Sequence, residues 1–426
     1  MNRIMAKLQR FRRIRQLHTI ISQETIKPSS PTPPHLKDHK FALIDHFATH
    51  IHMPWIFFYK NYKNGDINIL KKSLSQCLTQ YYPFAGRFLS PSTHHIDCND
   101  QGVEFLEASI NTSLDSFILK KEQDKTLDHL IPNGLGCSFE KTSPNMLEVQ
   151  LNHFTCGGVA VSVSISHKIA DGFTMLNLCN HWASVTRGLS PINPSFSNLY
   201  ISDIIVPEVQ NVEETFKTKY ANRIFVFPNS KLNELKKKIN AMGTTPVNPS
   251  RVESLTSLLF KCATTAKSGY FHPSNCLYQI VNLRNKTTIT DFPKLVAGNL
   301  SPAALAKMAD SNQIEVITSL RKEIMKLQGV RDVKELGDFM VKWSLEFNNG
   351  CPTYACTSVC RFPFYEVDFG WGKPVRVMFR AANPGNNFVL MDTPCGDGIE
   401  ATVQLEEDVM ATFQHDKELL AYTQDI

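Results

Sequence analysis

A histidine and an aspartate four residues apart are the first candidates for chemistry in this sequence of 426 residues. They lie in SHKIADG (166–172), directly after VAVSVSI (159–165), whose alternating apolar residues are typical of a buried strand. Histidine titrates close to neutral pH, so His167 at the end of such a strand can serve as a general base. A buried histidine with a structural role is the alternative, because the spacing to Asp171 is common by chance.

A second stretch, DFGWGKP (368–374), has two glycines around a tryptophan and ends in a proline. This composition excludes a regular helix or a central strand and predicts a turn with an unusual backbone conformation. The sequence contains no G-x-S-x-G, no P-loop motif and no G-x-G-x-x-G after a strand. A serine hydrolase, a kinase and a dinucleotide-dependent enzyme are therefore disfavoured.

Length and composition indicate two domains. Hydrophobic residues make up 42% of the chain, and single cores tend to divide beyond about 250–300 residues. The net charge is only +5, without a basic stripe interleaved with aromatic residues, so we expect no nucleic-acid partner. No apolar stretch reaches the roughly 18 residues of a membrane-spanning helix, so we expect no membrane span.

The eleven cysteines are scattered and odd in number, which argues against a complete set of disulfides. Their one loose group, Cys351, Cys356 and Cys360, lacks paired C-x-x-C spacing and a nearby histidine, so we expect no metal site. Reduced thiols in a cytoplasmic protein fit this pattern. The first eighteen residues carry six Lys or Arg and no acid. A solvated basic extension is the favoured interpretation, and an organelle-targeting segment is the alternative.

Helix and strand signals mix along the chain, which indicates an α/β or α+β fold. Apolar spacing predicts helices, and Ser250 with Glu253 forms an S-x-x-E capping box at the start of one of them. The expected helices cover about 67–80, 172–188, 250–267 and 313–346. Strands are expected within 94–108, 147–167, 278–285 and 355–405, ahead of a last helix. Residues 188–215, rich in Pro, Ser and Asn, predict an inter-domain linker.

Together, and in this order, SHKIADG and DFGWGKP resemble the two motifs of the plant BAHD acyl-CoA-dependent acyltransferases. Further stretches agree with this resemblance from about residue 22 to the end: IKPSSPTP near the start, YYPFAGR (81–87), HIDCND (95–100), VNLRNK (281–286) and GN (298–299). The resemblance implies two chloramphenicol-acetyltransferase-like domains with a central solvent channel between them. His167 is expected at the middle of the channel, with coenzyme A entering from one face and the acceptor from the other.

With the length argument, the resemblance suggests four segments. They are a basic N-terminal extension (1–21), an N-terminal domain with the HxxxD motif (22–187), a crossover linker (188–215) and a C-terminal domain with the DFGWG motif (216–426). A monomer is expected.

The implied reaction is transfer of an acyl group from acyl-CoA to an alcohol. His167 takes the hydroxyl proton, the oxygen attacks the thioester carbonyl, and coenzyme A leaves as the thiol. Acyl-CoA is then a co-substrate, and neither a permanently bound cofactor nor a covalent acyl-enzyme is expected.

The resemblance also assigns roles to other residues. Asp171 is expected to form a structural ion pair with Arg284 rather than to relay a proton. Structural roles are likewise expected for Asp368, Gly370, Trp371 and Gly372, although the indole N–H of Trp371 is an alternative donor to the transition state. Coenzyme A is expected at Ser250, Arg251, Thr357 and Ser358, where a helix N-terminus beside an arginine suits a phosphate.

Two departures from related sequences favour acetyl-CoA as the donor. Malonyl-transferring members carry YFGNC where this chain has LVAGNL (295–300), and residues 173–181 offer no arginine for a malonyl carboxylate. The short motifs SSPTP, CND, CGG and FYEVDFGWGKP are similar to those of the family branch that acylates alkaloids and terpenoid alcohols. The alternatives are acyl transfer to an amine or a sugar hydroxyl with a longer or branched acyl-CoA, and a catalytically silent binding protein.

Overall fold

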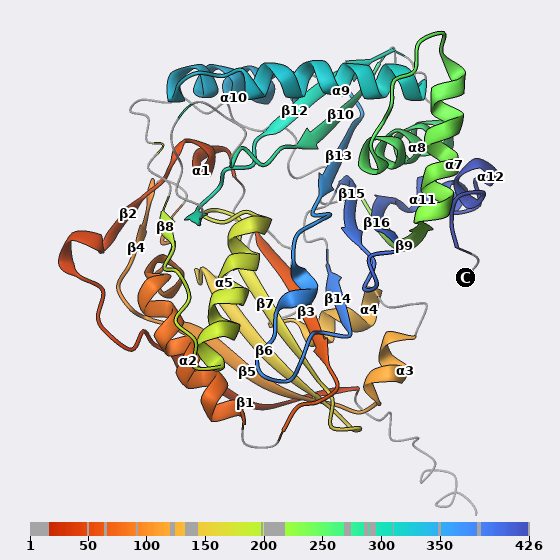
Figure 1. The fold of residues 1–426 in the computed structure, drawn as a ribbon. Coiled ribbons are helices and arrows are strands. Elements are labelled where there is room, and N and C mark those ends of the chain that lie inside the picture. The colour runs from red at the N-terminus through yellow and green to blue at the C-terminus, as the bar shows by residue number, and fades with distance from the viewer. Residues whose placement is uncertain are drawn as a thin grey trace, which may run out of the picture.

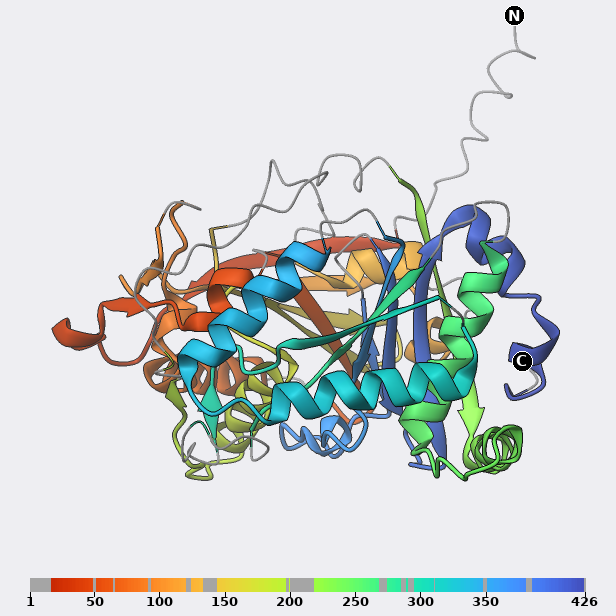
Figure 2. The same ribbon diagram turned by 90° about the horizontal axis from the view of Figure 1, so that it is seen from above.

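The computed structural model describes residues 17–48, 51–63, 66–90, 93–119, 124–132, 144–196, 199, 218–267, 274–284, 289, 295–309, 311–347, 351–380 and 385–424. Most of the predicted N-terminal extension and most of the predicted linker lie outside these residues. Two six-stranded sheets dominate the architecture, each covered by helices (Figures 1 and 2).

The first sheet carries the strand that precedes His167. In spatial order its strands are β1 (His18–Ile26), β5 (Val103–Ile110), β6 (Leu147–Phe154), β7 (Val159–Ser166), β3 (His52–Tyr59) and β14 (Arg376–Phe379). Strand β7 is buried along its whole length, and its alternating Val and Ile side chains join the largest hydrophobic core. The predicted strand is therefore confirmed, and it ends one residue before His167.

The second sheet is built from the other half of the chain. Its strands, in spatial order, are β12 (Ala303–Met308), β10 (Asn275–Ile280), β13 (Thr353–Ser358), β15 (Asn386–Asp392), β16 (Gly398–Glu406) and β9 (Tyr220–Pro228). Two small ladders lie outside the large sheets: β2 (Asp38–Lys40) pairs with β4 (His95–Asp97), and β8 (Ser195–Phe196) pairs with β11 (Val296–Ala297).

Helices cover both sheets. Those of the first half are α1 (Leu43–Phe47), α2 (Asp66–Gln80), α3 (Leu114–Ile118), α4 (Asp124–Leu127) and α5 (Gly172–Thr186). Those of the second half are α7 (Asn229–Met242), α8 (Arg251–Ala266), α9 (Gln313–Gln328), α10 (Val333–Phe347), α11 (Glu407–Phe413) and α12 (Lys417–Leu420). In the described part of the chain, no helix combines the length and apolar character that crossing a bilayer requires.

Local capping explains why several predicted helices are found where the sequence places them. The hydroxyl of Ser250 accepts from the backbone N–H of Glu253 (3.2 Å), and the Glu253 carboxylate accepts from the backbone N–H of Ser250 (2.7 Å), so α8 starts as expected. Helix α5 ends before Gly188, whose φ of 75° stops it.

Other expectations need correction. The helical stretch 313–346 is two helices, because Gly329 ends α9 and a short turn separates it from α10. The strand expected over 278–285 ends at Ile280, and the following residues turn to carry Arg284 toward the first half. The extension is shorter than 1–21, because β1 starts at His18 and pairs with β5 from there.

The segment that contains DFGWGKP packs in the first half of the molecule, not the second. Strand β14, which follows the motif, pairs antiparallel with β3. Phe364, Phe369 and Trp371 are buried in the same core as α2 and α5. A boundary at residue 215 that gives the whole remainder to a C-terminal domain is therefore wrong for this segment, since its aromatic side chains fill the first core.

Asp368 holds the DFGWGKP turn together. One of its carboxylate oxygens accepts from the backbone N–H groups of Gly370 (2.7 Å) and Gly372 (2.9 Å). Both glycines have positive φ, 98° and 86°, a conformation that disfavours any other residue type. Trp371 between them packs edge-on against Tyr59 and donates its indole N–H to Asp66 at the start of α2 (2.8 Å).

These contacts predict a stability role for Trp371. Its substitution Trp371→Ala removes a side chain that is 5% exposed and leaves the Asp66 carboxylate without this donor. We expect the free energy of unfolding to fall by about 3–5 kcal/mol, measured by urea unfolding. The control Trp371→Phe retains ring packing and is expected to lose less. An equal loss of unfolding free energy in both variants would show that the cavity left by the missing ring is not the main cause of the destabilisation.

Candidate active site

His167 lies at the junction between β7 and α5. Its backbone N–H donates to the carbonyl of Ile51 (2.7 Å), and its carbonyl accepts from the side-chain amide of Asn299 (2.9 Å). The ring nitrogen Nδ1 is buried and has no hydrogen bond of normal geometry to any described residue. Burial lowers the pKa of His167, and the charge of Asp171 opposes this effect. The ring is therefore neutral at neutral pH and able to accept a proton.

Asp171 begins α5 and turns its carboxylate away from His167. As the N-cap residue it accepts from the backbone N–H and the hydroxyl of Thr174 (both 2.9 Å). The backbone N–H of Leu300 (3.1 Å) and the hydroxyl of Ser301 (2.8 Å) donate to its other oxygen. Both oxygens are thus used by groups other than His167, so the geometry does not support a catalytic dyad.

Arg284 completes this arrangement as sequence analysis predicted. Its guanidinium donates to both Asp171 oxygens (2.7 and 3.3 Å) and to the carbonyls of Val296 and Gly298 (both 2.9 Å). Both side chains are almost fully buried, at 3% and 4% exposure. The positive charge of Arg284 and the other donors hold the pKa of Asp171 down at about 2, against the effect of burial. The pair joins the start of α5 to the second half of the chain.

Asn299 fixes the backbone of His167 from the second half. Its amide donates to the carbonyl of His167 and to the carboxylate of Asp45 (2.8 Å), which lies in α1. Asp45 is 2% exposed, and burial raises its pKa to about 7. Beside it, the Lys168 ammonium donates to the carbonyl of Ala48 (3.0 Å), and burial lowers its pKa to about 8. Burial therefore shifts the pKa values of both Asp45 and Lys168 toward neutral pH, close to the backbone that presents His167.

Asp45 is a member of this site that the sequence did not predict. Asn299 was expected only as part of the GN pair, without a role. No sequence signal marks Asp45, because a single aspartate in FALIDHF (41–47) matches no catalytic motif. Only the tertiary structure brings it within hydrogen-bond distance of Asn299, 254 residues away in the chain.

The C-terminal end of β13, in the second half of the chain, lies close to the start of α5. A Cβ added at Gly172 would lie 3.8 Å from the side chain of Val359. The next residue of α5, Phe173, contacts Phe362 edge-on, with ring centroids 5.9 Å apart. The predicted coenzyme A residues Thr357 and Ser358 directly precede this contact, at the C-terminal end of β13. The histidine motif and this strand end therefore lie side by side.

The other two predicted coenzyme A residues lie at the start of α8, near the same edge of the second sheet. Arg251 pairs with Asp392 at the end of β15 (3.4 Å), and the backbone N–H of Arg361 donates to the same carboxylate. Because β15 is the neighbour of β13, the four predicted residues share one edge. The capping box engages the hydroxyl of Ser250, and Asp392 and Asn229 engage the guanidinium of Arg251. Their availability to coenzyme A stays a prediction.

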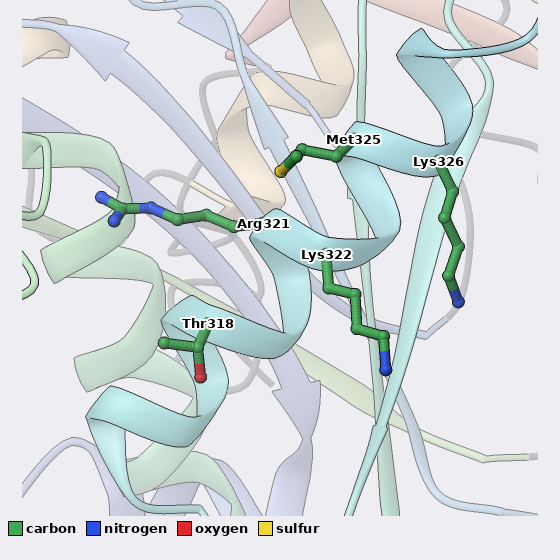
Figure 3. A pocket seen from close by; sticks show the side chains of 5 residues that line it. All are labelled: Thr318, Arg321, Lys322, Met325 and Lys326. Atoms are coloured by element: carbon green, nitrogen blue, oxygen red, sulfur yellow. The ribbon is translucent and has the colours of Figure 1, made fainter.

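A pocket on the molecular surface does not belong to this site. Figure 3 shows it on the exposed side of α9, lined by Thr318, Arg321, Lys322, Met325 and Lys326. All five side chains come from one helix, and Arg321 is already paired with Glu253 (2.6 Å). Elsewhere, the described residues contain no group of three or more His, Cys, Asp or Glu side chains suited to a metal ion.

Comparison with known proteins gives matches over nearly the whole chain. A model of the Transferase family matches residues 18–420. The chain is 38% identical to akuammiline synthase 1 of Alstonia scholaris, covering 94% of this chain and 97% of that protein. It is 36% identical to 17,18-epoxy-17-hydroxycur-19-ene N-malonyltransferase of Strychnos nux-vomica (95% and 90% covered). It is 33% identical to deacetylvindoline O-acetyltransferase of Catharanthus roseus (94% and 97% covered).

Among solved structures, vinorine synthase superposes with a TM-score of 0.81 at 29% identity, covering 96% of this chain and 98% of that one. The mixed α/β fold predicted from the sequence is thereby confirmed. The central solvent channel stays a prediction.

The buried ion pair predicts an acid-sensitive contribution to stability. Asp171→Asn leaves Arg284 buried without its anion, so the free energy of unfolding at neutral pH is expected to fall by about 3–5 kcal/mol. The folded-state pKa of about 2 lies below the ordinary 3.8. The contribution is therefore fully present above the ordinary value and is lost as the pH falls through about 2. Urea unfolding of both proteins across this pH range measures the difference.

The matched control is Asp416→Asn, which changes a half-buried aspartate that caps α12 by accepting from the backbone N–H of Leu419 (2.8 Å). We expect it to cost less than about 1 kcal/mol, because asparagine caps a helix about as well as aspartate does. A wild-type advantage over Asp171→Asn that stays constant down to the lowest pH would contradict the assignment.

A second prediction concerns Asn299 as a positioning residue. Asn299→Ala removes the donor to the His167 carbonyl and to buried Asp45. We expect kcat to fall about tenfold, since a small misplacement of a catalytic group is costly, with KM for acyl-CoA little changed. Steady-state kinetics on the folded variant measures both. A rise in KM at unchanged kcat would instead indicate a binding role.

Proposed function

We propose a specific reaction for this chain, which belongs to the Transferase family and is an acyl-CoA-dependent acyltransferase: it transfers an acetyl group from acetyl-CoA to a hydroxyl of an alkaloid or a terpenoid alcohol. One observation carries the proposal. Burial lowers the pKa of His167, and the hydrogen bonds of the Asp171 carboxylate go to groups other than His167, at the point where both halves of the molecule meet. The names of akuammiline synthase 1 and of deacetylvindoline O-acetyltransferase support a specialised-metabolite acceptor.

His167 acts as the general base in this proposal. Its neutral imidazole accepts the proton of the acceptor hydroxyl as the oxygen attacks the thioester carbonyl. The C–S bond then breaks, the acyl group stays on the acceptor oxygen, and the coenzyme A sulfur leaves with the proton. The described cysteines need no part in this reaction, because the thioester is already an activated acyl donor.

Asp171 and Arg284 act as positioning residues. Their ion pair fixes the start of α5 relative to Val296 and Gly298 of the second half. The helix start in turn fixes the turn that presents His167. Loss of activity on substitution of Asp171 is therefore expected without any proton relay through its carboxylate.

The identity of the acyl donor rests on two features of the sequence. The absence of an arginine from residues 173–181 and the sequence LVAGNL (295–300) support acetyl-CoA as the acyl donor. Malonyl-CoA with an amine acceptor is the second candidate, and the name of the relative from Strychnos nux-vomica favours it. Coenzyme A itself is proposed to bind at Ser250, Arg251, Thr357 and Ser358, because these four residues share one edge of the second sheet near the start of α5.

The test follows thiol release from acetyl-CoA and malonyl-CoA over a panel of alkaloid and terpenoid alcohols and amines. Wild-type protein is expected to release coenzyme A only in the presence of an acceptor alcohol, and fastest with acetyl-CoA. His167→Ala is expected to lower kcat by about 10²- to 10⁴-fold, because it removes the base. The acid limb of the kcat/KM profile should lie below the ordinary pKa of 6.5, since burial lowers the pKa of His167 and only the neutral ring accepts a proton.

The control is His415→Ala, which removes an exposed histidine after α11 and should leave the rate unchanged. Coenzyme A release only with malonyl-CoA and an amine would show that the proposed acetyl donor and alcohol acceptor are wrong. Coenzyme A binding without turnover for every pair would favour a silent binding protein and refute the proposed reaction.

A further inference from the structure

Two thiols lie against each other at one end of the second sheet. The sulfur atoms of Cys276, at the start of β10, and Cys351, just before β13, are 2.9 Å apart. A disulfide has an S–S bond of about 2.05 Å, so the sulfurs need to approach by only about 0.9 Å. No other cysteine pair in the described residues has a hydrogen-bond contact between two thiols.

The backbone holds the two cysteines in place. Strands β10 and β13 are parallel neighbours, with Cys276 paired to Thr353 (Figure 1). The backbone N–H of Cys276 donates to the carbonyl of Pro352 (2.8 Å), and the Cys351 thiol donates to the carbonyl of Ser274 (3.2 Å). The sheet therefore presents the sulfurs to each other without any rearrangement of the strands.

The two thiols differ in accessibility, which suggests an order of reaction. Cys351 is half-buried, whereas Cys276 is 3% exposed. A small reagent therefore meets Cys351 first. Burial, together with the neighbouring Cys351 thiol, raises the pKa of Cys276 to about 12. Once Cys351 forms a mixed disulfide, its thiol no longer contributes to that increase, and Cys276 lies against the sulfur that it must attack.

We propose that Cys276 and Cys351 are a reversible dithiol–disulfide site, oxidised by exchange with a small-molecule disulfide of the glutathione type. The Cys351 thiolate attacks one sulfur of that molecule, forms a mixed disulfide and releases one thiol. The Cys276 thiolate then attacks the Cys351 sulfur, forms the internal disulfide and releases the second thiol. One small disulfide is reduced to two thiols, and both protein thiol protons pass to the released sulfurs.

The disulfide joins strands at the end remote from the active site. Beyond its C-terminal end, β10 continues to Arg284, and β13 ends at Thr357 and Ser358, so both strands run from the cysteines toward the site. The link closes a loop between residues 75 apart in the chain, which restricts the unfolded state. Oxidation is therefore expected to stabilise the second sheet and to leave the acyl-transfer rate unchanged.

The experiment incubates the purified full chain in oxidised and reduced glutathione at graded ratios. Intact mass, peptide mapping and thermal unfolding are then measured. Wild type is expected to yield a linked Cys276–Cys351 peptide pair, lighter by two hydrogen atoms than the two reduced peptides, and to gain several degrees in Tm, all reversed by a dithiol reductant. Cys276→Ser is expected to stop at a glutathione adduct on Cys351, without the gain in Tm.

The matched control is Cys395→Ser, which changes an exposed cysteine outside the pair and should oxidise as wild type does. A stable glutathione adduct on Cys351 in the wild type, with no internal link, would overturn the proposal. So would a link between other cysteines, or an unmodified pair under conditions that modify Cys395.

Discussion

The buried ion pair between Asp171 and Arg284 is the constraint on which the active site depends. A carboxylate and a guanidinium that are almost fully buried are tolerable only when both are paired and hydrogen-bonded. Here further bonds of the pair reach the backbone at Val296, Gly298 and Leu300, all in the second half of the chain. The helix that follows His167 cannot move relative to that half without breaking them. A charge pair thus fixes the junction at which the histidine lies.

Two other features bind the halves together and make the junction stiff. Strand β14 follows the DFGWGKP turn and closes one edge of the first sheet, although it comes late in the chain. Its half-buried Arg376 forms an ion pair with the buried Glu400 of β16 in the second sheet. The aromatic residues of the same segment fill the core beneath α2 and α5. The second motif therefore contributes packing and turn geometry to the half of the molecule that carries His167.

Electrostatics separates the roles of two carboxyl groups close to the histidine. Asp171 is surrounded by donors and a cation, which keep it ionised and occupied. Asp45 is equally buried, and burial raises its pKa to about 7 although Ala42 and Asn299 donate to it and the charge of Lys168 opposes the increase. Asn299 connects Asp45 to the backbone of His167. The histidine itself loses basicity through burial, which favours the neutral form that a general base requires.

The sequence by itself determined the local elements. The alternation before His167 predicted β7, Ser250 and Glu253 predicted the start of α8, and the glycines around Trp371 predicted a turn with an unusual backbone conformation. Those signals depend on side-chain period and capping, which act over a few residues. The resemblance to a family supplied the pairing of Asp171 with Arg284. Only the tertiary structure brought Asp45 to Asn299, placed β14 in the first sheet and set Cys276 against Cys351. These contacts join residues far apart in the chain, and sheet order, which no local pattern encodes, decides which of them meet.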